Sequence, residues 1–372
     1  MESAGNATVA AQSSVNATYD QKNPFAAAVI GVLAVVGIVG NSLVVFIVVK
    51  YRDMHSVTNA YICNLARTDI CFLAVCATPA VIQLINGDGW TLGDFMCRFT
   101  VYMQSVSVQA TVGTFTAMTV DRCAVIFNPL TSRARRTKTA VRIIISLIWI
   151  TSCLMHLPVV LFFGAVYTPY NKSFDCTYLF SHPTKFAIYT TYEVLVMYVV
   201  PLAIIGTSNV GIAMRVSGTR MPANIRKCRG GRRAAESSSQ EADRRAGSNA
   251  TLQRVGNADN DNSTHVTTMV SIIIIFFAVC WGPGHALRMY MVYSERIENF
   301  DLILGLNTFT LCLQYFNAAA NPFLYAFLGR NFRDHLKVRC HSCILVPKTR
   351  YVPTHYHSTD TTRRSNALPT SL

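Results

Sequence analysis

Long apolar runs separated by short polar connections divide the chain. Each run reaches the roughly 20 residues that a helix needs to cross the hydrocarbon core of a bilayer. Five runs contain no Asp, Glu, Lys or Arg and two equally long runs contain isolated charges, in chain order 25–49, 59–85, 99–120, 143–166, 186–214, 266–287 and 302–328. The pattern predicts an all-α membrane protein built as a seven-transmembrane helix bundle.

Composition and charge agree with a membrane location. Only 14% of the 372 residues are charged, against about 25% in a typical soluble protein. Most of the 33 Lys and Arg residues lie in alternate connections, at 122–142, 215–254 and 330–372. Basic residues stay on the cytoplasmic side of a membrane, which predicts an extracellular N-terminus and a cytoplasmic C-terminus. The net charge of +14 therefore calls for anionic membrane lipid and cytosolic partners, and not for nucleic acid.

The predicted domain organisation follows from these spans. Residues 1–24 form an extracellular tail, and residues 25–328 form the seven-helix domain, whose long cytoplasmic loop 215–265 is polar and expected to be disordered. Residues 329–372 begin with a short amphipathic eighth helix on the cytoplasmic membrane surface and end in a tail.

Several candidate modification sites lie in these connections. The glycosylation motifs on the predicted outer side begin at Asn6, Asn16 and Asn171. Cys340 and Cys343 follow the amphipathic segment and are either palmitoylated or simply reduced cytosolic thiols.

The cysteine positions leave one disulfide. Ten of the 12 cysteines lie inside spans or on the cytosolic side, and only Cys97 and Cys176 face the oxidising exterior. A bridge between Cys97 and Cys176 therefore joins the outer end of the third span to the second outer loop.

Polar residues inside spans are costly, so they are candidates for function. Asn41, Asp69, Asn317 and Asn321 lie at similar depths. They either form a polar core that holds water or a cation such as sodium near Asp69, or supply ordinary hydrogen bonds between helices.

Prolines interrupt five spans past their midpoints, at Pro79, Pro158, Pro201, Pro283 and Pro322. A bundle of helices kinked by proline is compatible with a conformational switch, although transporters also have broken helices. Asp121 and Arg122 end the third span and are either functional or a simple interfacial anchor.

These features form an ordered set of motifs. In chain order they are Gly40-Asn41, Asn64-Leu65-Ala66 with Asp69, Cys97, Asp121-Arg122, Trp149, Pro201, Cys280-Trp281-Gly282-Pro283 and Asn321-Pro322-Phe323-Leu324-Tyr325. Through them the chain resembles the rhodopsin-like G-protein-coupled receptors over nearly all of residues 25–335. Within that family it is most similar to the kisspeptin receptor group, through runs such as "GWTLGDFMCRF" and "VSVQATVGTFTAMTVDR".

The resemblance implies a plasma-membrane receptor that is not an enzyme and has no cofactor. Its expected partners are an extracellular C-terminally amidated peptide, a heterotrimeric G protein of the phospholipase-C and calcium class, arrestin and receptor kinases. Kinase sites are expected in the tail at Ser358, Thr359, Thr361, Thr362 and Ser365.

The resemblance also assigns roles in activation. Asp121 is expected to restrain Arg122 at rest, and Arg122 to meet the G protein. Asp69, Trp281, Pro283, Asn321, Pro322 and Tyr325 are the expected switch residues. Two positions depart from the family pattern, Cys123 and Asn209, where tyrosine is usual. Asn209 predicts altered basal activity.

The candidate ligand-binding residues are Gln104, Glu193, Trp281, His285 and Arg288. Either Glu193 and Arg288 pair with each other, or Glu193 accepts the arginine that precedes the amidated aromatic residue of kisspeptin-type peptides. In the second account Gln104 meets the amide and Trp281 lies beneath the aromatic ring.

Alternative functions are a galanin-like or allatostatin-A-like peptide receptor and, in a different class, a multi-span transporter. The second half of the chain does not repeat the first, which disfavours the transporter.

Overall fold

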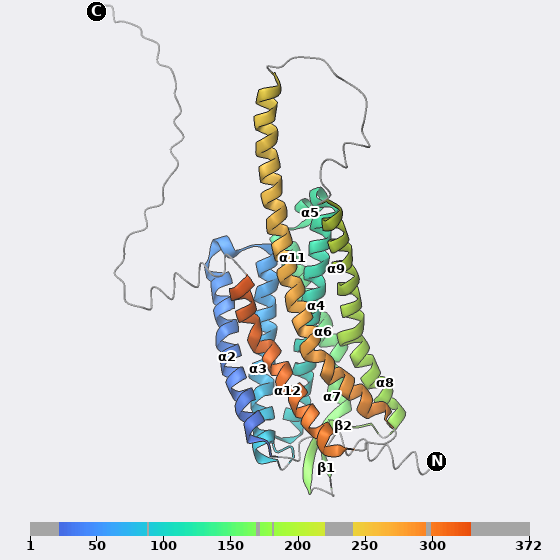
Figure 1. The fold of residues 1–372 in the computed structure, drawn as a ribbon. Helices are drawn as coiled ribbons and strands as arrows, with labels where there is room; N and C mark the ends of the chain where they lie inside the picture. Colours follow the sequence, from blue (N-terminus) through green and yellow to red (C-terminus); the bar gives the residue numbers. More distant parts are fainter. Residues whose placement is uncertain are drawn as a thin grey trace, which may run out of the picture.

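A computed structural model describes residues 22–87, 89–168, 172–180, 182–219, 241–294 and 299–328. Its long helices run side by side as one bundle (Figure 1). They are α2 (Pro24–Lys50), α3 (Val57–Asn86), α4 (Gly93–Phe127), α6 (Lys138–His156), α8 (Pro183–Val194) continued by η3 (Leu195–Val199) and α9 (Val200–Thr219), α11 (Glu241–Tyr293) and α12 (Phe300–Leu328). Short elements connect them, namely η2 (Arg52–Met54), α5 (Pro129–Arg135), α7 (Val159–Phe162) and the strands β1 (Phe163–Thr168) and β2 (Ser173–Tyr178).

Local sequence fixes where several helices begin and end. The side chain of Asn23 accepts a hydrogen bond from the backbone of Ala26, and Pro24 occupies the first turn of α2, where its missing N–H is not needed. Ser56 and Thr137 cap α3 and α6 in the same way. Gly87 ends α3 with a φ of 66°, a conformation that glycine adopts without strain.

The predicted third span lies at the centre of the bundle. Six helices of the described residues are long and apolar enough to cross a membrane, and α4 is the seventh long helix but is less apolar than these. It packs against α3, α6, α9 and α11, and its buried positions include Ser105, Ser107 and Thr114. Its polar side chains therefore face protein and not lipid.

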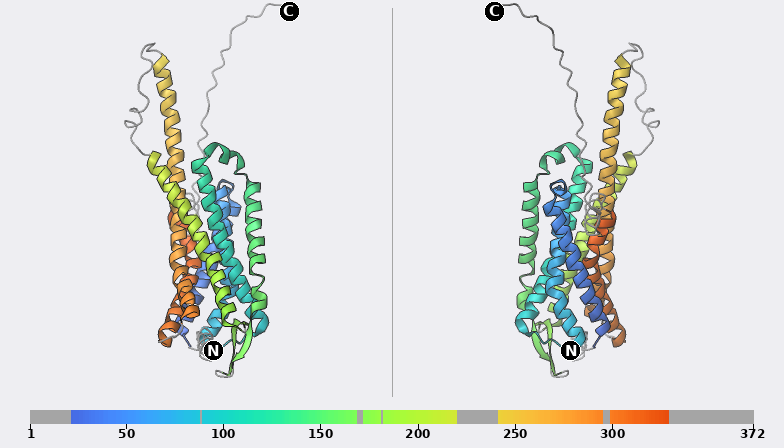
Figure 2. Two further views of the ribbon diagram at one scale, coloured as in Figure 1. Left: turned by 90° about the vertical axis from the view of Figure 1, so that its right-hand side faces the viewer. Right: turned by 90° about the vertical axis from the view of Figure 1, so that its left-hand side faces the viewer.

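A β-hairpin covers one end of the bundle. β1 and β2 pair antiparallel, with Phe163 opposite Tyr178 and Thr168 opposite Ser173. The predicted disulfide is confirmed, because Cys97 at the start of α4 is bonded to Cys176 in β2. Both side views place the hairpin at the same end as the start of α2 (Figure 2). We call this the hairpin end, and the opposite end, where α4 carries Arg122, the Arg122 end.

Two side chains of α4 also fasten the hairpin. Asp94 accepts a hydrogen bond from the backbone of Ala165 at 2.9 Å. Arg98 donates to Asp94 at 2.7 Å and to the carbonyl of Val160 at 2.5 Å. These hydrogen bonds join α4 to the hairpin region beside the disulfide.

Two predicted boundaries are wrong. The fourth span was expected to extend to residue 166, but α6 ends at His156, just before Pro158, and residues 163–166 lie in β1. Strand pairing with β2 satisfies their backbone groups. The apolar helical span itself runs from Lys138 to Phe162, and Pro158 interrupts it between α6 and α7, as expected.

The other wrong boundary is in the cytoplasmic loop. Disorder was expected over 215–265, but α9 continues to Thr219 and α11 begins at Glu241. Extending a helix that is already formed needs no new nucleus, so polar residues join it at small cost. Residues 220–240, the eighth helix, the cytoplasmic tail, Asn6, Asn16, Asn171, Cys340 and Cys343 lie outside the described residues.

The fifth span contains a local irregularity. Between α8 and α9 the backbone N–H of Val200 donates to the carbonyl of Leu195, five residues earlier, so η3 is a π-helical segment. Only Val200 separates it from Pro201. The side chains of α8 are thereby turned relative to those of α9.

Candidate ligand-binding site

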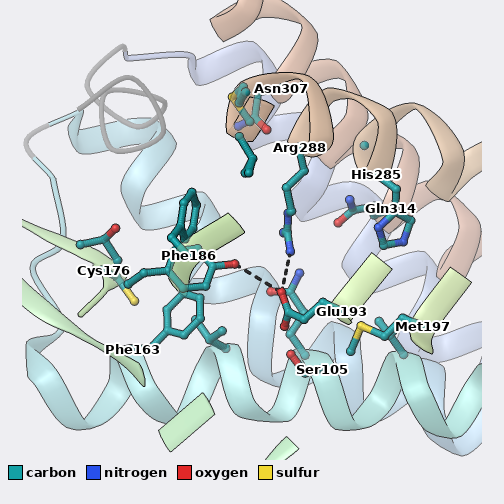
Figure 3. A pocket seen from close by; sticks show the side chains of 18 of the residues that line it. Ser105, Phe163, Cys176, Phe186, Glu193, Met197, His285, Arg288, Asn307 and Gln314 are labelled. Atoms are coloured by element: carbon teal, nitrogen blue, oxygen red, sulfur yellow. Dashed lines mark hydrogen bonds and ion pairs between the residues drawn. The ribbon is translucent and has the colours of Figure 1, made fainter. Parts of the chain in front are cut away.

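A pocket of about 200 Å³ lies at the hairpin end, among α4, β2, α8, η3, α11 and α12. Figure 3 shows side chains converging on it from the hairpin and from several helices. All five candidate ligand-binding residues line it, namely Gln104, Glu193, Trp281, His285 and Arg288. Residues far apart in the chain are therefore brought to one site.

Glu193 is a buried acid in the wall of this pocket. Its side chain is only 5% exposed. Tyr189 donates a hydrogen bond to Oε1 at 3.1 Å, and Tyr178 donates to Oε2 at 3.4 Å. These hydroxyls stabilise a carboxylate in a place where an isolated charge would be costly.

Arg288 completes the group from α11. Its Nη1 lies 3.3 Å from Oε2 of Glu193, and Figure 3 shows the two side chains pointing toward each other. The arginine side chain is 42% exposed, in contrast to the acid. The expected pairing of Glu193 with Arg288 is thus present at 3.3 Å, with a cation that solvent can reach.

Tyr178 belongs to β2 and was not anticipated from the sequence. Burial raises the pKa of its hydroxyl, and the negative charge of Glu193 raises it further. The hydroxyl therefore remains protonated and serves as a donor to Glu193.

The floor of the pocket is aromatic. Trp281 is 7% exposed and stacks beside Phe277, with ring centroids 5.7 Å apart, and it contacts Phe72 edge to face. Its indole N–H donates to the side-chain oxygen of Asn317 at 3.4 Å. His285 lies beside Trp281 and Tyr198. An aromatic ring of a ligand that enters from the hairpin end would therefore meet an apolar surface. The polar core lies on the other side of that surface.

Sequence reasoning missed several lining residues. Gln83, Asp175, Asn307 and Gln314 add polar groups to the walls. Asp175 is buried and accepts a hydrogen bond from Thr168 at 2.7 Å. Apart from the bridge formed by its neighbour Cys176, nothing in the sequence marked Asp175, because its place depends on the register of the hairpin.

Below the pocket, the polar residues of the spans lie in contact. Asn321 donates to Asp69 at 2.8 Å, and Asn41 donates to the carbonyls of Gly37 and Ala318. Asp69 and Ser107 both border a small cavity under Trp281, and the buried hydroxyl of Ser107 has no hydrogen-bond partner among the described residues. Within the same residues, no three His, Cys, Asp or Glu side chains form a cluster that could hold a metal.

At the Arg122 end, Asp121 has two arginine partners. Arg122 lies 3.0 Å from its Oδ2, and Arg136 donates to both carboxylate oxygens at 2.8 and 3.0 Å. Arg122 also contacts the hydroxyl of Thr58. Pro283 and Pro322 lie inside α11 and α12, and Tyr325 is buried near the same end.

The two atypical positions lie near this end as well. Asn209 accepts a hydrogen bond from Ser271 at 3.2 Å, which joins α9 to α11. Cys123 lies 3.9 Å from the carbonyl of Ser208.

Comparison with known proteins supports this arrangement. The profile of the family "7 transmembrane receptor (rhodopsin family)" matches residues 40–325. The chain belongs to the rhodopsin family of seven-transmembrane receptors. Members of this family are receptors and not enzymes, and this receptor is a multi-pass protein of the plasma membrane.

Within the family, the chain is similar to several individual receptors. The receptor is 33% identical to the KiSS-1 receptor of Homo sapiens over 317 residues, which cover 83% of this chain and 72% of the relative. It is 31% identical to G-protein coupled receptor 54 of Oreochromis niloticus over 309 residues, 82% and 75% of the two chains. Somatostatin receptor type 4 of Rattus norvegicus is 25% identical over 318 residues, 85% and 73% of the two chains. The expected resemblance to kisspeptin receptors is therefore confirmed.

Proposed function

We propose that the receptor binds an extracellular, C-terminally amidated peptide of the kisspeptin type and signals through a heterotrimeric G protein of the phospholipase-C and calcium class. In this proposal the hairpin end is extracellular and the Arg122 end is cytoplasmic. The single observation that carries it is the buried carboxylate of Glu193, whose arginine partner is 42% exposed. Similarity to two kisspeptin-receptor relatives supports the ligand class.

Glu193 supplies the anionic contact for the peptide. Its two tyrosine hydroxyls remain in place, while Arg288, whose Nη1 lies 3.3 Å from the carboxylate, moves aside. An arginine of the peptide then forms a bidentate pair with the same carboxylate. A peptide with a neutral or acidic residue there leaves Arg288 in place and gains nothing, so selectivity arises from the exchange of one cation for another.

The remaining parts of the peptide terminus meet the other pocket residues. Gln104 offers both a donor and an acceptor to a terminal amide, and the ring of the last residue rests on Trp281. Trp281 contacts Asn317 in the polar core and Phe277 in α11. A ligand that displaces the indole therefore also shifts these two side chains. Binding then favours the conformer in which α11 moves, by the difference in affinity for the two states.

The Arg122 end is the proposed G-protein site. At rest Asp121 holds Arg122, and in the active conformer Arg122 is released toward the G protein. Kinase and arrestin contacts with the tail, palmitoylation of Cys340 and Cys343, and glycosylation are further proposals on residues outside the described ranges.

A sodium ion near Asp69 is a separate proposal. The buried carboxylate and the hydroxyl of Ser107, which has no partner among the described residues, border the same small cavity, and oxygen ligands suit a hard cation. When bound, the ion would neutralise Asp69. Asp69 and Ser107 are the residues of this chain that would hold it.

The test uses cells that express the receptor while calcium and cyclic AMP are recorded together. Kisspeptin-type, galanin-type and allatostatin-type amidated peptides are applied in turn. Two matched kisspeptin-type controls replace the terminal amide by a carboxylate or the arginine by neutral citrulline. We expect a calcium response to the kisspeptin type that each control weakens at least about tenfold, since each loses a charge-assisted contact or leaves a buried group unpaired.

Other results would contradict the proposal. A stronger response to the galanin or allatostatin type would assign a different ligand class. An equal response to the arginine peptide and the citrulline peptide would show that Glu193 does not recognise the arginine of the ligand. A change in cyclic AMP without a calcium response would show that the receptor activates a different class of G protein.

A further inference from the structure

Arg67 is a charged residue on the outside of a membrane-spanning helix. It lies two residues after Leu65 and two residues before Asp69, both of which are buried in the bundle. Residues two apart in an α-helix point about 200° away from each other, so the side chain of Arg67 points away from the bundle. It is exposed in the structure, as this geometry requires.

The depth of Arg67 places it within the bilayer. It lies ten residues after Val57, the first residue of α3, and the helix has 30 residues. At about 1.5 Å per residue Arg67 is about 15 Å along a helix of about 45 Å. A hydrocarbon core of about 30 Å centred on α3 begins about 7 Å from its end. The Cα of Arg67 therefore lies inside the hydrocarbon, in the half nearer the Arg122 end.

The described part of the receptor does not neutralise this charge. Among the described residues, no acidic side chain or hydrogen-bond acceptor contacts the guanidinium of Arg67. An unpaired arginine at this depth costs several kcal/mol unless it reaches the interface or a counter-ion. None of the described residues supplies a counter-ion, and the exposed side chain faces the surrounding lipid.

The direction of the side chain indicates where that counter-ion lies. Helical side chains tilt toward the N-terminus of their helix, and the N-terminus of α3 is at the Arg122 end. A long flexible stem directed that way brings the guanidinium to the headgroups of the adjacent leaflet. Farther along α3, Ala74 and Thr78 are also exposed, and their small side chains leave space for an acyl chain.

We propose that Arg67 forms a binding site for an anionic phospholipid in the leaflet at the Arg122 end. The planar guanidinium donates two hydrogen bonds to the lipid phosphate, a geometry that a lysine cannot reproduce. The acyl chain of the same lipid lies along the small side chains of α3. Charge complementarity between an unpaired cation and an anionic headgroup selects this occupant over a neutral lipid.

The test measures lipid selectivity of the purified full-length receptor in phosphatidylcholine nanodiscs. Spin-labelled phosphatidylserine or spin-labelled phosphatidylcholine is added, and the fraction of slowly moving lipid at the protein surface gives a relative affinity. We expect Arg67→Gln to lower the preference for phosphatidylserine about fivefold, the value for one basic residue near a membrane surface. Arg67→Lys should retain part of this preference, because lysine keeps the positive charge but cannot donate two parallel hydrogen bonds as the guanidinium does.

Arg142→Gln is the matched control. Arg142 is an exposed arginine near the start of α6, at the same end of the bundle, and its substitution removes the same charge. It should change the preference less than about twofold if the effect belongs to a defined site. Equal losses in both variants would indicate a diffuse basic surface and overturn the proposal.

Two further readouts keep the test decisive. Arg67→Gln should insert and fold at least as well as the parent, because it removes a charge from the hydrocarbon without breaking a contact within the described chain. An unchanged lipid preference, together with cross-linking of Arg67→Cys to a second receptor, would assign this face to a protein contact instead. Peptide affinity measured on the same samples is expected to be unchanged, so failure here is separable from failure of the proposed ligand.

Discussion

The two ends of the bundle each bury a carboxylate next to arginine, yet they hold it differently. At the hairpin end Glu193 has one arginine contact of 3.3 Å from a half-exposed side chain, plus two tyrosine hydroxyls. At the Arg122 end Asp121 has contacts of 2.8 and 3.0 Å with two arginines, one of them bidentate. The first arrangement favours exchange of the cation, and the second favours retention of it.

This difference fits a receptor whose two ends have different tasks. A binding pocket needs an acid that is already desolvated but only loosely paired, so that a ligand can replace the partner. A resting-state restraint needs a pair that breaks only when the whole bundle changes conformation. The predictions below test whether the hairpin end is exchangeable and the Arg122 end is restrained.

The largest effect is expected from Cys97→Ser at the hairpin end. The bridge joins residues 79 positions apart, and closing a loop of that size restricts the unfolded chain by about 4 kcal/mol in the chain-entropy model. Without it the hairpin is held over the pocket only by non-covalent contacts, such as those of Asp94, Arg98 and Tyr178. Binding of a radiolabelled peptide at the cell surface should be abolished.

Cys71→Ser is a matched control for the disulfide variant, because it makes the same chemical change at a free cysteine in α3. It should retain surface binding of the peptide. Normal binding and trafficking of Cys97→Ser would refute the role given to the bridge.

Arg122→Ala should separate binding from signalling. Arg122 is at the end of the bundle opposite to the pocket, so peptide affinity should remain within about threefold while the calcium response is lost. Equilibrium binding and calcium release on the same cells measure the two effects. Parallel loss of both, with normal surface expression, would show that the two ends are not distinct in function.

Glu193→Lys should weaken binding of an arginine-containing peptide by at least about 2 kcal/mol, or roughly thirtyfold, because a buried charge pair is replaced by repulsion. A peptide analogue with glutamate in place of that arginine should recover part of the affinity. Competition binding with both peptides measures this exchange of specificity.

The double variant Glu193→Lys with Arg288→Glu decides between ligand recognition and internal pairing. Recovery of the original peptide by the double variant would mean that the two residues serve only each other. Persistent loss, with rescue by the glutamate analogue, supports a direct contact between Glu193 and the peptide.

The smallest effect is expected from Arg136→Gln at the Arg122 end. Arg136 is part-exposed, so its bidentate contact with Asp121 is partly screened, and its loss should shift the resting equilibrium by about 1 kcal/mol. Basal inositol phosphate accumulation should rise roughly fivefold. Arg135→Gln, at the neighbouring exposed position, should leave the basal level unchanged.

Much of the bundle could be predicted from the sequence because membrane spans are specified locally. Charge-free runs located the helices, and the side of the membrane assigned to each cysteine left Cys97 and Cys176 as partners. Asp69 marked the interior for the same reason, since a polar residue in hydrocarbon needs a partner.

The parts that could not be predicted depend on long-range contacts. The strand at 163–168 forms because β2 lies beside it, and the apolar character of those residues suits a membrane helix equally well. Tyr178 and Asp175 enter the pocket through the register of that hairpin, and the partnership of Arg136 with Asp121 needs α5 to turn back. No periodicity in the sequence encodes these positions.

The π-helical segment Leu195–Val199 also affects how relatives are aligned. It holds one residue more than an α-helical turn would, and one residue rotates a helix by roughly 100°. A relative without this extra residue would present the neighbour of Glu193 to its pocket under an ungapped alignment anchored at Pro201. Equivalent positions in α8 should therefore be assigned by which side chain faces the pocket, with a one-residue gap allowed at Leu195–Val199.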